Sequence, residues 1–336
     1  MIICCGEALI DMVPVLSDSG QTSYAPLVGG AIFNTAIGLG RLGIKVGMVS
    51  GISHDLFGQQ LHDALAASNV DTSYLVRSNL PTTLAFVSLN EGHASYTFYD
   101  ENSAGRCLQI ADLPDLYDTH GDNQSNSQSN SQSNSQSNSQ SNSQSNNALY
   151  FGGISLINEP AADAYCALAQ KYADDMVIVL DPNIRTSFIN HDQAYRQRLQ
   201  HIIEVADIIK VSDEDLDWLV GDATAEPQQV SLLRGQSKAI VIVTKGADGA
   251  TAYLTTGEAV HQNVPKVCVV DTVGAGDTFN AGLLTKLVNL NLMSKAALAN
   301  ISSTELLTAL AYAAQVAAVN VSRQGANPPW LSDLQV

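Results

Sequence analysis

An aspartate directly follows three small residues in the segment 271–277, which reads DTVGAGD. This segment lies between an apolar run at 264–270, where we expect a strand, and a run with helical character at 278–290. The start of a helix carries N–H groups without an intrahelical partner and a partial positive charge, so it binds anions readily. The small residues would let a phosphate approach the backbone there.

Asp277 has the chemistry of a general base. Its charge would weaken phosphate binding, but a carboxylate is useful at this point if it takes the proton of an alcohol that attacks phosphorus. The N–H groups of Gly274, Ala275 and Gly276 would then stabilise the transferring phosphoryl group. The plain alternative is that Asp277 only caps its helix, and a bare GxGD pattern does not exclude this.

The composition predicts a globular protein with a large core. The chain has 336 residues, of which 45% are hydrophobic, enough for one large domain or two small ones. A net charge of −17 disfavours nucleic acid and anionic membranes as partners. We find no run of uncharged apolar residues long enough to span a bilayer. The start of the sequence resembles a first strand rather than an export signal, so we expect a cytoplasmic protein.

Five cysteines are present, an odd number without the spacing of a metal site. We expect them to be reduced thiols in the core, with Cys4 and Cys5 pointing to opposite faces of a strand.

Strand-like runs alternate with helical patterns along most of the chain, which predicts an α/β fold with a mostly parallel sheet covered on both faces. Two stretches, 12–28 and 82–106, lack helices and fit a small accessory sheet. The expected strands are 2–8, 45–50, 84–89, 95–99, 148–151, 176–180, 208–211, 239–244, 251–255 and 264–270, and the expected helices are 31–41, 57–68, 159–173, 278–290 and 305–321.

A polar repeat interrupts this alternation. Residues 124–147 contain only Gln, Ser and Asn, so they cannot form a core, and we interpret 122–147 as a disordered SQSN-repeat insert in a surface loop.

Several motifs resemble the ribokinase-like (PfkB) family of carbohydrate kinases. The sequence VVDTVGAGDTFNAGLL at 269–284 resembles the C-terminal signature of that family, and 29–58 resembles its N-terminal signature. The blocks between them come closest to the bacterial fructokinase branch. The resemblance implies a single ribokinase-like domain over 1–336, a three-layer α/β sandwich with a small β-sheet lid. It also implies an ATP-dependent phosphotransferase.

The resemblance assigns roles to the acceptor side of the site. It makes Asp277 the general base and the Gly-Ala-Gly turn the anion hole. Asp11, Gly30 and Asn34 would bind sugar hydroxyls, and Arg185 would approach the substrate or the travelling phosphate. Ordinary structural roles are the alternative for each.

The resemblance also assigns a nucleotide side. Thr244, Gly246 and Gly249 would lie along the ribose and phosphates of ATP. Ser212 and Asp215 occupy the positions of the Asn-x-x-Glu motif of the family, which acts on phosphate and Mg²⁺ through water.

Three further residues complete the expected site. By the same resemblance, Asn327 would border the adenine, and carbonyls near Asp271 and Val273 would hold a monovalent cation such as K⁺. Mg²⁺ would be held chiefly by ATP phosphates and waters.

These expectations together favour transfer of the γ-phosphate of ATP to a hydroxymethyl group of a free sugar, with D-fructose first. The same scaffold also binds 2-keto-3-deoxygluconate, ribose and nucleosides, and a non-catalytic sugar or nucleotide sensor is the alternative of another class. Asp100 stands where many fructokinase-like sequences carry a basic residue. We also expect a homodimer that pairs through the lid.

A GxGxxG pattern at Gly38, Gly40 and Gly43 suggests a dinucleotide-binding enzyme. In that fingerprint a strand precedes the glycines and a helix follows, and here the expected order is reversed. Gly43 is better interpreted as the end of a helix. The sequence also lacks the GxxxxGK[ST] motif of P-loop enzymes.

Overall fold

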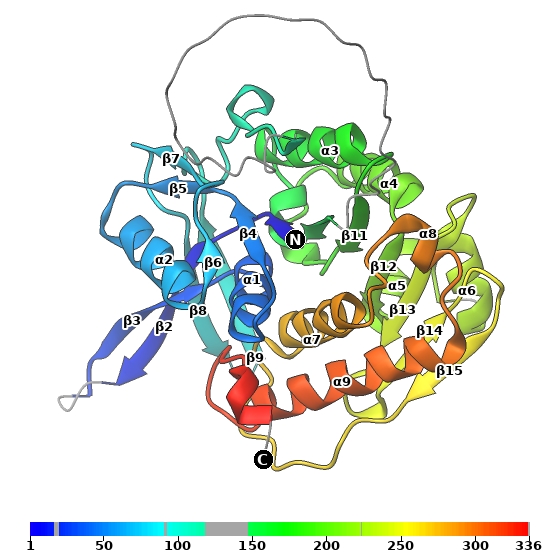
Figure 1. Ribbon diagram of the computed structural model, residues 1–336. Helices are drawn as coiled ribbons and strands as arrows, with labels where there is room; N and C mark the ends of the chain where they lie inside the picture. Colours follow the sequence, from blue (N-terminus) through cyan, green and yellow to red (C-terminus); the bar gives the residue numbers. More distant parts are fainter. Residues whose placement is uncertain (17–19, 91–92, 118–146, 223, 335–336) are drawn as a thin grey trace, which may run out of the picture.

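The middle layer of the fold is a nine-stranded sheet, seen in a computed structural model that describes residues 1–16, 20–90, 93–117, 147–222 and 224–334 (Figure 1). Neighbouring strands from β13 to β6 run parallel, whereas β14 and β15 are antiparallel additions at one edge. The order is β15 (Ala259–Gln262), β14 (Ala250–Tyr253), β13 (Ile240–Thr244), β12 (Ile208–Ser212), β11 (Val177–Asp181), β10 (Ala148–Gly152), β1 (Ile2–Cys5), β4 (Val46–Val49) and β6 (Val70–Asp71).

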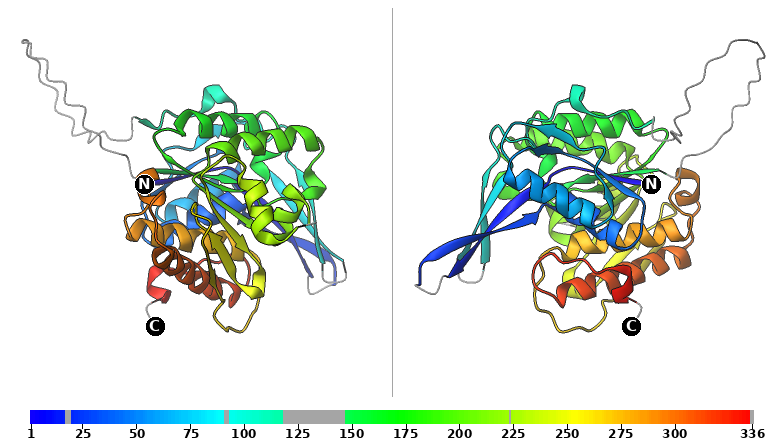
Figure 2. Two further views of the ribbon diagram at one scale, coloured as in Figure 1. Left: turned by 90° about the vertical axis from the view of Figure 1, so that its right-hand side faces the viewer. Right: turned by 60° about the vertical axis from the view of Figure 1, so that its left-hand side comes forward.

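Helices cover both faces of this sheet (Figures 1 and 2). Ile2 and Cys4 belong to one hydrophobic core, while Ile3 and Cys5 belong to the other, as the period of a strand requires. The first core is closed by α1 (Ala31–Arg41), α2 (Leu56–Ala67), α7 (Ala275–Asn289), α8 (Lys295–Leu298) and α9 (Ser303–Val321). The second core is closed by α3 (Ala161–Tyr172), α4 (Asp192–Val205), α5 (Asp213–Val220) and α6 (Glu226–Arg234). The expected three-layer sandwich is confirmed.

A separate four-stranded sheet lies beside the body, and two of its strands, β2 and β3, extend away from it (Figure 2). Its order is β3 (Thr22–Gly29), β2 (Leu9–Leu16), β8 (Leu84–Asn90) and β9 (His93–Tyr99). A further pair joins β5 (Gly51–Ser53) to β7 (Val76–Ser78). The small accessory sheet is thus confirmed, whereas its role as a lid and the single-domain boundary stay predictions.

The prediction of a strand at 264–270 is wrong. The segment is an extended loop, and Val269 and Val270 are about 60% exposed. The antiparallel pair β14–β15 already occupies the position next to β13, so this segment does not extend the sheet there. It is held instead by hydrogen bonds from the N–H groups of Val270 and Asp271 to the Val321 carbonyl.

The end of α1 agrees with the interpretation of the GxGxxG pattern. Gly43 has a φ of +81° and follows the C-cap residue Leu42, and its N–H donates to the Gly40 carbonyl over 3.1 Å. Strand β4 follows rather than precedes the glycines. The arrangement is therefore a helix terminus and not a dinucleotide-binding turn.

The cysteines agree in part with the expectation of core thiols. Cys4, Cys5 and Cys166 are buried free thiols, whereas Cys107 is half-buried and Cys268 is exposed. Cys268 departs because it lies in the loop where a strand was expected.

Helix α9 is long and apolar enough to cross a membrane by length and composition alone. Its Leu306, Leu310 and Val316 are buried in the core that it shares with α7, so the described fold uses it as a core helix. A cytoplasmic location stays a prediction. The polar insert 122–147, apart from its last residue, lies outside the described residues.

Candidate active site

The glycine turn at the start of α7 is the centre of the site. Gly274 precedes the helix with a φ of +73°, a left-handed conformation that favours glycine. A Cβ there would stand 2.7 Å from the Ala326 side chain, so the position has no room for one. Gly276 and Asp277 fall in the first turn of the helix, where N–H groups lack intrahelical acceptors. The turn can therefore present backbone donors to an anion.

A cavity of about 270 Å³, here called the acceptor cavity, opens beside this turn. It brings together residues from β2, from the start of α1, from the loop after β11 and from the start of α7, although they are far apart in the sequence. The sequence-predicted residues among its lining are Asp11, Gly30, Asn34, Arg185, Val273, Gly274, Ala275, Gly276 and Asp277.

Asp277 is half-buried on one wall of the acceptor cavity. Its Oδ2 accepts a hydrogen bond of 2.9 Å from Asn34 Nδ2, and its carbonyl accepts one of 3.2 Å from the Thr35 hydroxyl. Desolvation raises the pKa of Asp277 to about 7, while the Asn34 hydrogen bond acts in the opposite direction. A carboxyl group with a pKa near neutrality is well suited to general-base work.

Asp11 lies across the same cavity, where a Gly-Gly turn gives it room. Its carboxylate lies directly against Gly29, in the space that the Cβ of any other residue at position 29 would occupy. Burial raises the pKa of Asp11 to about 6. Gly30 has a φ of +111°, and a Cβ there would stand 2.9 Å from the Glu7 carbonyl. The turn thus leaves backbone and carboxylate open to a polyhydroxylated ligand.

A second cavity of about 670 Å³, here called the nucleotide cavity, lies on the other side of the glycine turn. Thr244, Gly246 and Gly249 line it as predicted, and so do valines of the loop 264–270. The two cavities share Thr272, Ala275 and Gly276 as common lining, so a ligand in one can meet a ligand in the other at the turn.

Ser212 and Asp215 do not line either cavity. They form a capping box at the start of α5, in which the Asp215 N–H donates to the Ser212 hydroxyl over 3.0 Å and the Ser212 N–H donates to the Asp215 carboxylate over 3.2 Å. The other oxygen of Asp215 accepts from the Ile184 N–H over 2.9 Å, which fastens the loop that carries Arg185. Their role with ATP stays a prediction.

Asn327 is likewise not part of the nucleotide cavity. Its Oδ1 accepts a hydrogen bond of 2.9 Å from Arg41, and its N–H donates to Asn320 over 2.8 Å. The expected contact of Asn327 with adenine stays a prediction, and the position of Asn327 outside the nucleotide cavity does not support it.

The residues expected near a monovalent cation are engaged in hydrogen bonds. The Asp271 carboxylate accepts from the N–H groups of Val273 (3.0 Å) and Gly325 (2.9 Å), and the Val273 carbonyl accepts from Asn320 Nδ2 (2.9 Å). Within the described residues, no group of three His, Cys, Asp or Glu side chains could hold a metal ion.

A buried polar network under the turn was missed by the sequence analysis. Lys210, in the middle of β12 and 5% exposed, places its Nζ 3.1 Å from Asp181 Oδ2. The same oxygen accepts 2.6 Å from Asn280 of α7. A Cβ built on Gly276 would stand 3.5 Å from Lys210 Nζ, so the ammonium lies just beneath the turn. Burial alone would lower the pKa of Lys210, but the charge of Asp181 outweighs it and raises the pKa above its usual value.

Other lining residues of the acceptor cavity were also missed, namely Glu7, Tyr96, Phe98 and Phe188. Glu7 accepts from the N–H groups of Ala31 and Ser155, over 3.0 and 3.3 Å, and so connects α1 to the loop after β10. A charged residue in the apolar segment at the start of the chain was the available signal for Glu7.

A mostly parallel sheet between two layers of helices, with an acceptor cavity and a nucleotide cavity on two sides of one glycine turn, defines a phosphotransferase of the ribokinase-like fold. The chain belongs to the pfkB family of carbohydrate kinases, whose profile matches residues 1–116 and 115–333. A fructokinase from Rhizobium leguminosarum bv. trifolii is 44% identical over 306 residues, which are 91% of this chain and 85% of that protein.

Two solved structures agree with this assignment. The crystal structure of a Xylella fastidiosa fructokinase with bound ATP has a TM-score of 0.82 and 27% identity, covering 99% of this chain and 96% of that chain. A Vibrio cholerae O395 fructokinase in a form with fructose, ADP and calcium ion has a TM-score of 0.76 and 25% identity, covering 97% of this chain and 94% of that chain.

Proposed function

We propose that this protein is an ATP-dependent fructokinase, which transfers the γ-phosphate of ATP to a hydroxymethyl group of free D-fructose. The fructokinase with 44% identity supports the choice of sugar, and the relatives crystallised with ATP or with fructose and ADP support both substrates. The observation that carries the proposal is the meeting of the two cavities at Ala275 and Gly276, with Asp277 on the acceptor side.

On the acceptor side, Asp11 and Asn34 hold ring hydroxyls, because a carboxylate accepts from hydroxyls and an amide both donates and accepts. The attacking hydroxyl lies next to Asp277, which takes its proton as the oxygen bonds to the γ-phosphorus and the bond from that phosphorus to ADP breaks. Arg185 reaches the acceptor cavity from the loop after β11, where its charge favours the travelling phosphoryl group.

On the donor side, Thr244, Gly246 and Gly249 border the nucleotide, and the apolar loop 264–270 covers its base. The backbone donors of the turn face the developing negative charge, and the Lys210 ammonium lies beneath the turn, where its charge acts in the same direction. Mg²⁺ would be held by ATP phosphates and water and would neutralise their charge. We also propose a monovalent cation near Asp271 and Val273, where it would stabilise the conformation of the segment before the glycine turn.

The small sheet offers a surface for a second copy of the chain. On one face of this sheet Val15 and Leu27 are 43% and 50% exposed, and on the opposite face Leu16 is 80% exposed. A small sheet with an apolar face is stable only when that face is covered, so we propose a homodimer through this sheet. Light scattering should give twice the mass of one chain, and a mass of one chain would reject the dimer.

The test of the function is ADP release over a panel of acceptors, with mass spectrometry of the products. We expect fructose to give the highest kcat/KM among fructose, ribose, 2-keto-3-deoxygluconate and nucleosides, with one phosphate added per ADP. A higher value for another acceptor would move the protein to another branch of the family. Binding of sugar and ATP without sugar-dependent ADP would favour the non-catalytic sensor.

A further inference from the structure

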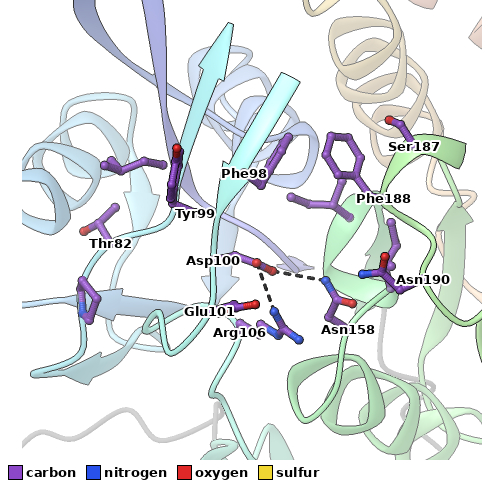
Figure 3. A pocket seen from close by; sticks show the side chains of 14 residues that line it. Thr82, Phe98, Tyr99, Asp100, Glu101, Arg106, Asn158, Ser187, Phe188 and Asn190 are labelled. Carbon is purple, nitrogen blue, oxygen red and sulfur yellow. Dashed lines mark hydrogen bonds and ion pairs between the residues drawn. The ribbon is translucent and has the colours of Figure 1, made fainter. Parts of the chain in front are cut away.

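A third cavity of about 590 Å³, here called the side cavity, lies between the small sheet and the body of the protein (Figure 3). Its walls come from the end of β9 with the residues after it, from the turn Gly153–Leu156 with the residues after it, and from the turn Thr186–Phe188. A volume of this size is within the range of small-molecule sites. The roles inferred above leave this cavity without an occupant.

The side cavity is adjacent to the acceptor cavity. Phe98, Ile154 and Phe188 line both of them. The rings of Phe98 and Phe188 meet edge to face with centroids 4.3 Å apart, so this pair forms part of the partition between the two spaces. A ligand in the side cavity can therefore lie next to a sugar in the acceptor cavity.

Polar groups converge on the far side of the side cavity from these rings (Figure 3). Asp100 Oδ1 lies 3.2 Å from Arg106 Nη1, and Asp100 Oδ2 accepts 3.3 Å from Asn158 Nδ2. The side chains of Asp100 and Arg106 remain 21% and 30% exposed, so both can also bind a ligand. The side cavity is therefore lined by an aromatic pair and by a cluster that donates and accepts hydrogen bonds.

The chemistry of this lining favours a neutral polyhydroxylated ligand. Carboxylates accept from hydroxyls, a guanidinium donates to them, and the faces of aromatic rings pack against the apolar face of a sugar ring. Asp100 and Glu101 carry two negative charges against the one positive charge of Arg106. Phosphate esters and carboxylates are disfavoured by this balance, and an apolar ligand would displace water from these groups without replacing its hydrogen bonds.

We propose that the side cavity binds a neutral sugar unit next to the acceptor. Two sources share this chemistry, a second free monosaccharide and the glycosyl part of an acceptor larger than one hexose. The second source rests on the proposed function, because it makes the side cavity an extension of the acceptor site.

Variants that fill the side cavity provide the test. Asn190 lines the cavity and is exposed, so Asn190→Trp adds a ring there without disturbing the core. Ser187→Trp fills it from a second exposed position. His191→Trp is the matched control, because His191 is exposed and adjacent but does not line the cavity. Thermal unfolding should show that all three variants fold.

Calorimetric titration without nucleotide distinguishes the two sources. If the ligand is a free sugar, glucose binds to the fructose-saturated protein with a stoichiometry of one. If it is part of the acceptor, at least one of turanose, lactulose and leucrose, which carry a hexose on different fructose hydroxyls, binds about tenfold tighter than fructose, as two net hydrogen bonds would provide.

In either case Asn190→Trp and Ser187→Trp should lose the glucose binding or the tighter disaccharide binding, while their affinity for fructose stays within about twofold of wild type. His191→Trp should behave as wild type in both titrations. Neither effect in the wild type, or an effect that persists in both filling variants, would overturn the proposal. Fructose-dependent ADP release from the same samples judges the proposed function separately, because it does not need an occupied side cavity.

Discussion

Asn34 donates a hydrogen bond of 2.9 Å to the carboxylate of Asp277, although 243 positions separate them in the chain. The bond joins the first turn of α1 to the first turn of α7, and both side chains face the acceptor cavity. It stabilises the ionised form of a carboxyl group whose pKa is otherwise raised by desolvation. The pKa of Asp277 therefore depends in part on Asn34, a residue that also lines the acceptor cavity.

The pH dependence of kcat/KM should report this carboxyl group. Only the ionised form accepts a proton, so we expect kcat/KM to fall about tenfold per unit as the pH drops below about 7, the pKa of Asp277. Removing the stabilising hydrogen bond with Asn34→Leu should raise that pKa and move the acid limb to higher pH. Steady-state assays from pH 5 to 9 measure both, and a limb that stays in place in the variant would contradict the role of Asn34.

The same pKa predicts a stability effect. The pKa of Asp277 in the folded state lies near 7, above the usual value of 3.8, so ionisation opposes folding. The contribution of protonated Asp277 to the free energy of unfolding is therefore complete below about pH 4 and is lost as the pH rises through 7. We expect Asp277→Asn to unfold at a higher temperature than wild type, with a difference that grows from pH 4 to 7 and then levels off. Calorimetry at several pH values measures it, and a difference that is constant with pH would exclude the raised pKa.

The two glycines of the turn should respond differently to alanine. Gly276→Ala places a Cβ at ordinary contact distance, 3.5 Å from Lys210 Nζ, at a residue that lines both cavities. We expect an unchanged melting temperature and a kcat/KM at least about tenfold lower. Gly274→Ala has a left-handed φ and a Cβ 2.7 Å from Ala326, so it should lower stability as well. Equal melting temperatures for both variants would contradict this difference.

Lys210 should contribute to stability and to catalysis in separable ways. Lys210→Met leaves the buried Asp181 carboxylate without its cation, which we expect to cost about 3–5 kcal/mol of unfolding free energy. The double variant Lys210→Met/Asp181→Asn removes the unpaired charge and should recover much of that loss. Its kcat should stay about tenfold low, because the turn has lost the positive charge beneath it. Recovery of both quantities would make Lys210 purely structural.

The sequence could predict the local features of the site but not its long-range contacts. The turn before Asp277 and the helix 31–41 depend on neighbouring residues, and the structure places both as expected. The prediction of a strand at 264–270 was wrong because an apolar pattern does not distinguish a strand from a loop that forms the wall of a cavity. The pairing of Lys210 with Asp181 joins separate strands, and no local pattern reveals it.

The roles of Ser212 and Asp215 show the same limit. Their spacing is that of a capping box as well as of a nucleotide motif, and the structure uses the box. The resemblance to a family could assign them to ATP, but only the placement of neighbouring loops decides what they touch.

The central claim is that Asp277 takes the proton of the acceptor hydroxyl beside the glycine turn. It is tested most directly by the kcat of Asp277→Asn, measured together with its calorimetric affinity for fructose. We predict that kcat falls by about two orders of magnitude or more, while the fold and the fructose affinity remain near wild type. A kcat within a few-fold of wild type would contradict the claim, because the amide cannot accept that proton.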